Sequence, residues 1–442
     1  MSLGLSLSGG GSRAMAFHRG TLKGLYEVGL LDKIDVVSTV SGGSIFGSAY
    51  LSSLKMGEKI DNFLKMVGDE LKRGFEKRSI NVRAIKMFLP GLTRSNVLAD
   101  IFNEIFLRGF LLSDLPDRPK LCINVSLLNN GQLGKFSKSY FKCSGIVSPE
   151  KGNSYSEPVD LEEYPLALAA TASAAFPGLL PPIYLKRGNE IPEGWGKGEL
   201  KRHKRFVLVD GGVLDNLGIQ SLLSEKSGFS CWDLIVSDAG TKEESWKPKG
   251  FFPKIASSLL GSVGIGSGFL SVPDLIRTAF IMQSKETREM RHNIFQEQIT
   301  SWLEEEILSE KPSQAARRFC RLELERASGN QRRKVLFVSV NRDWDEAIRK
   351  IPEWRLEELK EKVGESRLPE RRDTGGIEDF LKTAGVNLDT ARCYYEKMGG
   401  KNGIERANSV GTHFRAIDSD CLDALYYHSL WQIHLLYQIY WK

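Results

Sequence analysis

Three short stretches of the chain carry residue types that could perform acyl transfer. A glycine run, Gly9–Gly11, follows one apolar stretch, and Ser41 follows the next. Far downstream, Asp210 ends a third apolar stretch and precedes two glycines. Acyl transfer needs a nucleophile, a base that activates it and N–H donors for the oxyanion that forms. The serine, the aspartate and the glycine run could supply these three parts in that order.

Ser41 lies between an expected strand at 34–38 and an expected helix at 44–56, whose N-terminus would carry roughly half a positive charge. The stretch Thr39–Gly43 is close to the Gly-x-Ser-x-Gly elbow of serine hydrolases, with Thr39 in place of the first glycine and Gly43 as the second. The alternative is a serine that only caps the helix.

The glycine run also has two interpretations. Consecutive glycines after a strand allow their N–H groups to point into one concavity. Together with Ala14, the run also satisfies the G-x-G-x-x-A pattern of dinucleotide sites. Such a site needs an acidic residue at the end of the second strand, and Asp32 and Asp35 both precede that end. The nucleotide site is therefore the weaker interpretation.

Asp210 follows an apolar strand expected at 206–209, and the glycines beside it allow another side chain to approach closely. A simple turn aspartate is the alternative, and Asp215 and Asp238 are rival candidates for the base. A conventional triad would need a histidine. None of the six histidines lies at a strand-end turn, so a Ser–Asp dyad fits the sequence better; they are His18, His203, His292, His413, His428 and His434.

The order of strand-like and helix-like segments indicates an α/β fold with a parallel sheet. Strands are expected at 3–7, 34–38, 121–128, 134–140, 206–209, 234–237 and 334–340, and helices at 14–28, 44–56, 61–77, 96–107, 161–175 and 216–223. We expect one catalytic domain over residues 1–340, with a helical insertion at about 242–330 and its last core strand at about 334–340. Residues 341–442 are expected to form a mostly helical extension that packs on the core.

Composition and charge narrow the function classes. The 442 residues are 41% hydrophobic and carry a net charge of +6. This charge is compatible with contact with an anionic membrane surface. The sequence contains no dense stripe of basic residues interleaved with aromatic residues, which a nucleic-acid-binding protein would need. No transmembrane run or signal peptide is visible, so a cytoplasmic protein is expected. The six cysteines are expected to be thiols, and no calcium- or zinc-binding pattern is visible, so neither metal nor cofactor is expected.

The three motifs together resemble those of the patatin-like phospholipases, a family of lipid acyl hydrolases related in its active site to cytosolic phospholipase A2. The resemblance rests on Ser8–Ala14, Val40–Ser44 and Asp210–Gly212, in that order along the chain. Two further stretches, at 122–125 and 172–177, are also similar to the family. The resemblance covers about residues 3–240 and thins beyond them.

The resemblance implies a three-layer α/β/α sandwich with a mostly parallel central sheet, together with a Ser41–Asp210 dyad. Asp210 would act as general base on Ser41 and then activate the water for deacylation. The N–H groups of the glycine run, Gly9, Gly10 and Gly11, would form the oxyanion hole. Arg13 would stabilise this loop or contact a lipid phosphate, with a surface ion pair as the alternative.

The expected function is hydrolysis of acyl esters in phospholipids or related lipids through an acyl-enzyme, with peripheral membrane contact and no nucleic-acid partner. Phe269–Ile281 could form a lid or a membrane-interfacial helix, and the alternative is a helix packed in the core. Residues 435–442 could contact a membrane interface, and the alternative is the packed end of a helix. The alternatives are a Ser–His–Asp esterase and a non-catalytic protein on the same fold. Headgroup, acyl position and oligomeric state stay open.

Overall fold

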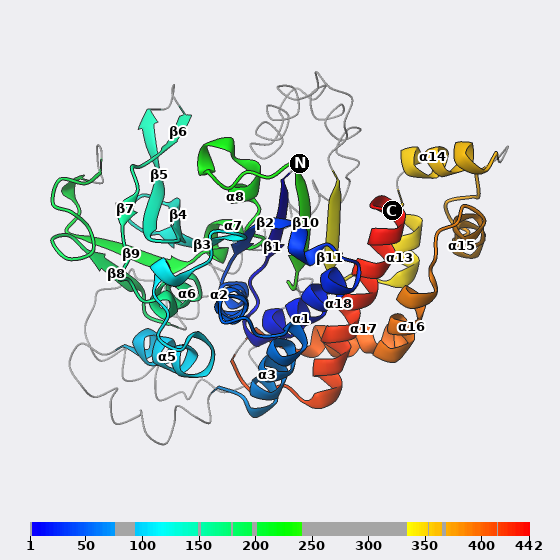
Figure 1. Cartoon of the computed structure of the whole chain (residues 1–442), viewed down its shortest axis with the longest axis horizontal. Helices are drawn as coiled ribbons and strands as arrows, with labels where there is room; N and C mark the ends of the chain where they lie inside the picture. The colour runs from blue at the N-terminus through cyan, green and yellow to red at the C-terminus, as the bar shows by residue number, and fades with distance from the viewer. Residues whose placement is uncertain are drawn as a thin grey trace, which may run out of the picture.

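The computed structural model describes residues 2–75, 93–148, 152–177, 180–196, 201–240, 334–351, 353–364, 368–412 and 414–442. Within these residues a single sheet runs through the molecule, with helices packed against it (Figure 1). The expected insertion at 242–330 and the segment Phe269–Ile281 lie outside the described residues.

The centre of the sheet is parallel and has the strand order β11-β10-β1-β2-β3. These strands are β1 (Leu3–Leu7), β2 (Ile34–Thr39), β3 (Lys120–Leu127), β10 (Asp233–Asp238) and β11 (Val335–Ser339). All five occur where apolar runs predict strands. Because they run in one direction, their carboxyl ends form one edge of the sheet, where ligands bind in folds of this type.

Beyond β3 the sheet continues with antiparallel strands. These are β4 (Gln132–Ser137), β5 (Tyr140–Ser148), β6 (Gly152–Tyr155), β7 (Val159–Asp160), β8 (Ile183–Lys186) and β9 (Arg205–Asp210). The single strand expected at 134–140 is therefore wrong, because the chain turns between β4 and β5. Ser139 has φ 64° at this turn, a left-handed conformation that ends an extended run.

Helices cover both faces of the sheet, but unequally. One face carries α1 (Gly11–Glu27), α2 (Gly42–Lys55), α3 (Ile60–Arg73), α5 (Arg94–Phe102) and α6 (Leu166–Ser173), and the other carries the short α7 (Gly212–Asp215) and α8 (Gln220–Leu223). Helix α6 starts later than the expected residue 161, because Pro165 keeps the residue before it out of the helical conformation. The helix expected at 216–223 begins only at Gln220, since Gly218 has φ 70°.

Alternation along the strands divides the apolar side chains between two cores. The larger core includes Val37, Ile123 and Ile235, and the smaller core includes Val36, Cys122 and Val236 on the opposite face. Neighbouring residues of one strand thus point to opposite faces, as the two-residue period of a strand requires. The sheet with a layer on each face confirms the expected α/β/α architecture.

The C-terminal part of the chain is helical and packs against α1 and β11. It contains α13 (Trp344–Arg349), α14 (Glu353–Val363), α15 (Thr374–Thr383), α16 (Asp389–Met398), α17 (Gly400–Ser409) and α18 (Ser419–Tyr440). Helix α18 approaches α1 so closely that a Cβ at Gly20 would lie 1.9 Å from the Tyr426 carbonyl oxygen. Leu435, Leu436 and Ile439 are buried, so the aromatic C-terminal stretch is the packed end of this helix.

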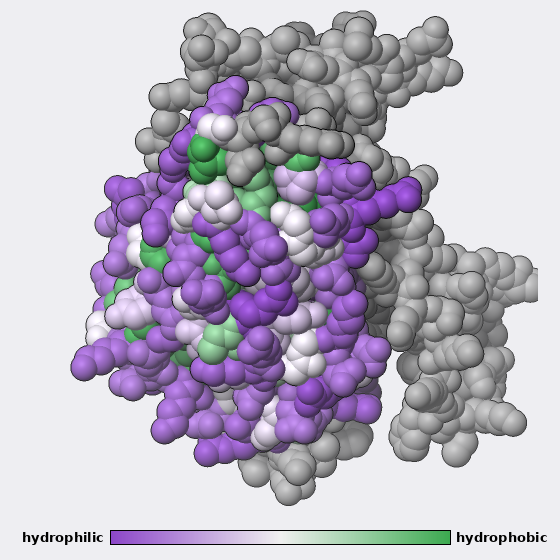
Figure 2. All heavy atoms as spheres, turned by 90° about the vertical axis from the view of Figure 1, so that its right-hand side faces the viewer, coloured by the Kyte–Doolittle hydropathy of each residue, from purple (hydrophilic) through white to green (hydrophobic). Residues whose placement is uncertain are grey.

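Figure 2 views the molecule from the right-hand side of Figure 1 and shows a mostly hydrophilic surface with small, separate hydrophobic spots. In the described part of the chain, no helix combines the length and the apolar character needed to cross a membrane.

Candidate active site

The two dyad candidates meet because β2 and β9 reach the same edge of β3 from opposite directions. β2 runs parallel to β3 and ends with Thr39 opposite Ile123. β9 runs antiparallel to β3 and ends with Asp210 opposite Val125. Because β4 occupies the other edge of β3 along this stretch, β2 and β9 share one edge. Their carboxyl ends therefore face each other across Asn124.

Ser41 has a backbone conformation that non-glycine residues rarely adopt. Its φ of 52° and ψ of −124° place it on a sharp turn between β2 and α2. The Oγ atom donates a hydrogen bond of 2.7 Å to Oδ2 of Asp210. Ser41 is 8% exposed and Asp210 is 2% exposed. Strain of this kind persists where the surrounding structure enforces it, and here it holds the hydroxyl against the carboxylate.

The environment of Asp210 changes its acidity. Burial is the largest effect and raises the pKa of Asp210 from 3.8 to about 7. Hydrogen bonds from the Ser41 hydroxyl and from the Gly212 N–H, the latter 2.7 Å from Oδ1, act in the opposite direction. A carboxyl group with a pKa near 7 can accept and return a proton at neutral pH, which is the requirement for a general base.

The two glycines after Ser41 allow α2 to begin in a crowded place. A Cβ at Gly42 would lie 2.3 Å from the Gly11 carbonyl oxygen, and a Cβ at Gly43 would lie 2.3 Å from the Leu7 carbonyl oxygen. Real Cβ atoms do not approach backbone this closely, so neither position accepts a side chain without movement of the chain. Gly43 thus has the steric role expected of the second elbow glycine.

Ser173, at the end of α6, connects the two halves of the site. Its Oγ accepts a 3.0 Å hydrogen bond from the Ser41 N–H and donates one of 2.6 Å to the Asn124 carbonyl. Its backbone carbonyl accepts a 3.2 Å hydrogen bond from the N–H of Gly211, next to Asp210. Ser173 therefore fixes the backbone of both dyad candidates.

The glycine loop differs in one respect from expectation. The Gly9 N–H donates a 3.0 Å hydrogen bond to the Asn216 carbonyl, so the prediction that Gly9 supplies an oxyanion donor is wrong. Gly9 matters instead for its size, since a Cβ there would lie 3.1 Å from Cβ of Ser41. Gly10 has φ 140° and Gly11 has φ 59°, and within the described residues their N–H groups have no partner.

Two helix N-termini converge beside Ser41. α1 begins at Gly11 and α2 begins at Gly42, and a Cβ at Gly42 would lie 2.8 Å from the Gly11 nitrogen. Neither helix has a side-chain cap, and in the described part of the chain the Gly42 N–H also lacks a partner. Uncapped N–H groups and the partial positive charges of two helix dipoles favour a negative charge at this place.

Arg13 is buried and donates its hydrogen bonds to the protein. Nε bonds to the carbonyl of Ala239 at 2.7 Å, Nη1 bonds to the carbonyl of Val410 at 2.8 Å, and Nη2 bonds to Oγ1 of Thr412 at 3.1 Å. These contacts join the first turn of α1 to the end of β10 and to the segment between α17 and α18. The surface ion pair considered from the sequence is wrong, because Arg13 is 4% exposed, and the contacts favour the loop-stabilising role over binding of a lipid phosphate.

The rival carboxylates have other partners. Asp215 accepts hydrogen bonds from the backbone N–H groups of Gly218 and Gln220 at 2.9 and 2.8 Å, and burial raises its pKa to about 6. Asp238 accepts a 2.9 Å hydrogen bond from the Gly240 N–H. Asp215 organises the turn between α7 and α8, and Asp238 organises the turn after β10. Asp210 is the carboxylate that receives the Ser41 hydroxyl.

The described histidines do not complete a triad. His18 is buried, donates from Nε2 to the Ser8 carbonyl at 3.0 Å and lies with Nδ1 2.8 Å from Oγ of Ser237. Burial lowers its pKa to about 4, so it is neutral and supports the glycine loop. Burial also lowers the pKa of His428 to about 4. None of the hydrogen bonds among the described residues joins a histidine to Ser41, and His292 and His413 lie outside those residues.

In the part of the chain that the structure describes, the cysteines are free thiols and no metal-binding site is formed. Free thiols are found at Cys122, Cys143, Cys231, Cys393 and Cys421, and Cys320 lies outside that part. No group of three or more histidine, cysteine, aspartate or glutamate side chains is placed there to hold a metal ion.

Sequence reasoning assigned no role to Ser173, Asn124 or Asn216. Ser173 and Asn124 lie in the two supporting stretches that resemble the family, at 172–177 and 122–125, but a lone serine or asparagine gives no signal of its partner. Their roles depend on contacts between α6, β3 and the segment after β9, which are distant in the sequence.

Comparison with known proteins supports this assignment of the fold. The family model of patatin-like phospholipases matches residues 5–223. Human GIVD cytosolic phospholipase A2 is 14% identical with a TM-score of 0.40, over 53% of this chain and 42% of that one. VipD from Legionella pneumophila is 15% identical with a TM-score of 0.28, over 87% of this chain and 66% of that one. No curated protein matches the chain.

Proposed function

Since residues 5–223 of this chain belong to the patatin-like phospholipase family, we propose that the protein is a serine lipid acyl hydrolase that uses a Ser41–Asp210 dyad. The observation that carries the proposal is the 2.7 Å hydrogen bond from the Ser41 hydroxyl to the Asp210 carboxylate, on a backbone turn with φ 52°. A helix-capping serine does not need this strained conformation, and a nucleophile presented on an elbow does.

In the first half of the reaction, Oγ of Ser41 attacks the ester carbonyl while Oδ2 of Asp210 takes the hydroxyl proton. The tetrahedral intermediate collapses, the carbon–oxygen bond to the leaving alcohol breaks, and Asp210 returns the proton to that alcohol. In the second half, Asp210 takes a proton from water, whose oxygen attacks the acyl-enzyme. The ester bond to Ser41 then breaks, and the proton returns to Oγ.

The N–H groups of Gly10 and Gly11 are the proposed oxyanion donors, and Gly42 is a third candidate. All three lie at the two converging helix N-termini and have no other partner among the described residues. In other serine hydrolases, loss of one such donor costs about 2.7–4 kcal/mol of transition-state stabilisation. The helix dipoles would add to this effect without reorganisation during the reaction.

Phospholipids and related lipids are the proposed substrates, which places the substrate in an aggregate rather than in free solution. The protein would therefore contact a membrane surface at least transiently. The family match supports the lipid class, and the headgroup, the acyl position and the chain length are left to direct assay.

Covalent labelling tests the dyad. A fluorophosphonate probe should label the wild type at Ser41, label Ser41→Ala not at all and label Asp210→Asn far more slowly. Circular dichroism and urea unfolding would establish that each variant is folded. Labelling that persists in Ser41→Ala would place the nucleophile elsewhere.

A folded wild type that stays unlabelled with and without liposomes would favour the non-catalytic alternative. A Ser–His–Asp esterase makes a different prediction: Asp210→Asn would retain most of its labelling, and a histidine substitution would abolish it. His292 and His413 are the positions to substitute first, because no described histidine is hydrogen-bonded to Ser41 or Asp210.

A further inference from the structure

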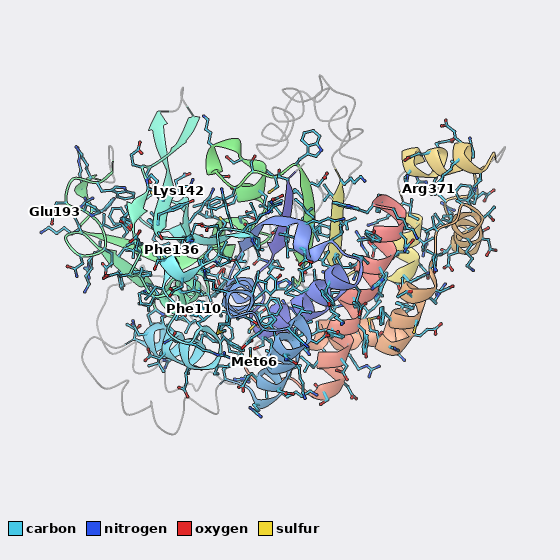
Figure 3. All side chains as sticks on the ribbon, in the orientation of Figure 1. Met66, Phe110, Phe136, Lys142, Glu193 and Arg371 are labelled. Carbon is cyan, nitrogen blue, oxygen red and sulfur yellow. The ribbon has the colours of Figure 1, made fainter. Side chains whose placement is uncertain are left out.

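A concentration of positive charge lies on the hairpin formed by β8, the start of β9 and their connection, at the end of β9 opposite Asp210. The described residues 183–196 and 201–207, here called the basic hairpin, contain six lysines and arginines and two glutamates. Its net charge of +4 is two thirds of the +6 carried by the whole chain. The basic hairpin lies at the left-hand edge of the molecule in Figure 3, where Glu193 of the connection is labelled.

The two faces of the basic hairpin differ in character. Ile183, Leu185 and Phe206 point inward and are buried. Tyr184 pairs with Val207 and Lys186 pairs with Arg205 on the outward face. The Arg205 guanidinium lies 5.6 Å from the centre of the Tyr184 ring, so cationic and aromatic groups are adjacent there.

Exposed apolar side chains gather at the same place. Among the described residues four large hydrophobic side chains are exposed, and two of them are Leu128 at 57% and Tyr184 at 39%. Both lie beside Val207, because the Leu128 N–H donates to the Val207 carbonyl at 3.0 Å and Tyr184 is the strand partner of Val207. An aliphatic and an aromatic side chain thus flank Val207, and Tyr184 shares its strand with Lys186.

The exposed basic side chains of the hairpin are available to a ligand. In the described part of the chain the exposed cations of the hairpin form no ion pair; they are Lys186, Lys201, Arg202, Lys204 and Arg205. The nearby Glu190 carboxylate accepts the backbone N–H of Lys186 at 2.7 Å. Lys186 and Arg205 are directly opposite each other across the strands, and like charges in this position destabilise a sheet.

Arg187 gives this surface a fixed shape. Its guanidinium donates to the backbone carbonyls of His203, Pro192 and Trp195 at 3.0, 2.9 and 3.1 Å, which braces the connection between β8 and β9. The exposed cations are therefore carried by a braced hairpin and not by a free tail.

We propose that the outward face of the basic hairpin binds the surface of an anionic phospholipid bilayer. The inference rests on the proposed function and deepens it, since it names the surface that brings the enzyme to its substrate. Lysine and arginine are attracted to anionic headgroups, and tyrosine with an adjacent leucine suits the boundary between headgroups and acyl chains.

A bilayer accounts for this surface better than a nucleic acid does. Single-stranded nucleic acids are bound by several aromatic side chains that stack on successive bases, and Tyr184 is the one aromatic side chain on this face of the two strands. The exposed Leu128 has no function against a phosphate backbone, whereas a bilayer interface would bury it.

Vesicle co-sedimentation tests the proposal with the full chain. The variant Lys186→Gln/Arg205→Gln is compared with the control Lys362→Gln/Lys382→Gln, which removes the same charge from exposed positions on α14 and α15 at the opposite side of the molecule. Vesicles of phosphatidylcholine with 30% phosphatidylserine are compared with pure phosphatidylcholine at low and high salt. Neutralising Lys186 and Arg205 should remove the repulsion between them, so the variant should fold at least as well as wild type.

The proposal predicts that wild type and control bind the anionic vesicles and that Lys186→Gln/Arg205→Gln binds about 10- to 30-fold more weakly, as expected for two headgroup contacts. High salt should weaken binding of wild type, and Leu128→Ser should weaken the binding that remains. Equal binding by wild type and Lys186→Gln/Arg205→Gln, or an equal loss in the control, would overturn the proposal. Tighter binding of a single-stranded oligonucleotide than of anionic vesicles would overturn it in favour of a nucleic-acid partner.

Two further measurements separate this inference from the proposed function. Fluorophosphonate labelling of Ser41 and hydrolysis of a soluble monomeric ester should be the same in wild type and in Lys186→Gln/Arg205→Gln, because the hairpin face does not touch the dyad. Vesicle binding without Ser41 labelling would contradict the hydrolase and leave the binding surface in place. Ser41 labelling without vesicle binding would support the hydrolase and contradict the proposed binding surface.

Discussion

The methyl group of Thr39 occupies the space that Gly47 leaves open one turn into α2. A Cβ at Gly47 would lie 2.6 Å from Cγ2 of Thr39, which is closer than two carbon atoms can approach. Thr39 stands where the usual elbow has its first glycine, and that glycine allows the following helix to pack closely. The requirement for a small residue has thus moved from the strand to the helix.

This contact predicts that the effect of Gly47→Ala on stability changes sign when Thr39 is replaced by serine. Gly47→Ala should destabilise the wild type by about 1–3 kcal/mol, because the new methyl group collides with Thr39. In Thr39→Ser, which removes Cγ2 and keeps the hydroxyl that bonds to Ser44, the same substitution should be neutral or stabilising by up to about 1 kcal/mol, since alanine favours a helix. Urea unfolding of the four proteins measures this coupling, and equal effects in both backgrounds would contradict it.

The pH dependence of activity should follow the ionisation of Asp210. Its pKa is raised to about 7 by burial, and it can accept the Ser41 proton only when ionised. The kcat/KM for a soluble ester should therefore rise with pH through about 7 and level off above it. Asp210→Asn should lose this rise together with most of the activity, by about 10²–10⁴-fold. A wild-type profile that is flat between pH 5 and 9 would exclude Asp210 as the base.

The same shift predicts that the dyad lowers stability. In the folded state Asp210 keeps its proton up to a pKa of about 7, whereas the unfolded value is 3.8. Between these values the folded state binds more protons, so its free energy of unfolding falls as pH rises. Asp210→Asn has no charge to bury, so relative to wild type it should gain stability from pH 4 to pH 8, by an amount on the order of 4 kcal/mol. Unfolding at several pH values tests this, and a constant difference would contradict the raised pKa.

Ser173 is predicted to be a positioning residue. Ser173→Ala removes the acceptor of the Ser41 N–H and should cost about 1–3 kcal/mol, seen mainly as a lower kcat with little change in KM. Ser221→Ala is the matched control, because its hydroxyl donates to the side chain of the same Asn124 at 2.5 Å without touching Ser41. Similar kcat values for the two variants would mean that Ser173 contributes only to stability.

Arg13 gives a prediction that separates a structural role from phosphate recognition. Its donors bind two carbonyls and a hydroxyl, so Arg13→Lys should lower activity on a phospholipid and on an uncharged ester by the same factor. Thr412→Val, which removes one of these partners away from the glycine loop, should have a smaller effect in the same direction. A loss confined to the phospholipid would show that Arg13 contacts the phosphate after all.

The sequence by itself determined where the central strands lie and which residues are candidates for the chemistry. Apolar runs and glycine turns located the central strands, and the elbow pattern and the strand-end aspartate singled out Ser41 and Asp210, because these signals are local. It could not show that Gly9 donates to Asn216, or that Arg13 and His18 are buried supports, because those partners lie hundreds of residues away or in loops without a periodic signal.

Tertiary structure alone decided how the parts meet. β2 and β9 face each other only because both pair with one edge of β3, one parallel and one antiparallel, and no local propensity encodes that choice. Burial in this arrangement raises the pKa of Asp210, and Ser173 holds both ends through contacts across the sheet. Local sequence identifies the candidate reacting residues, whereas strand pairing sets the distance between Ser41 and Asp210 and desolvation sets the acidity of Asp210.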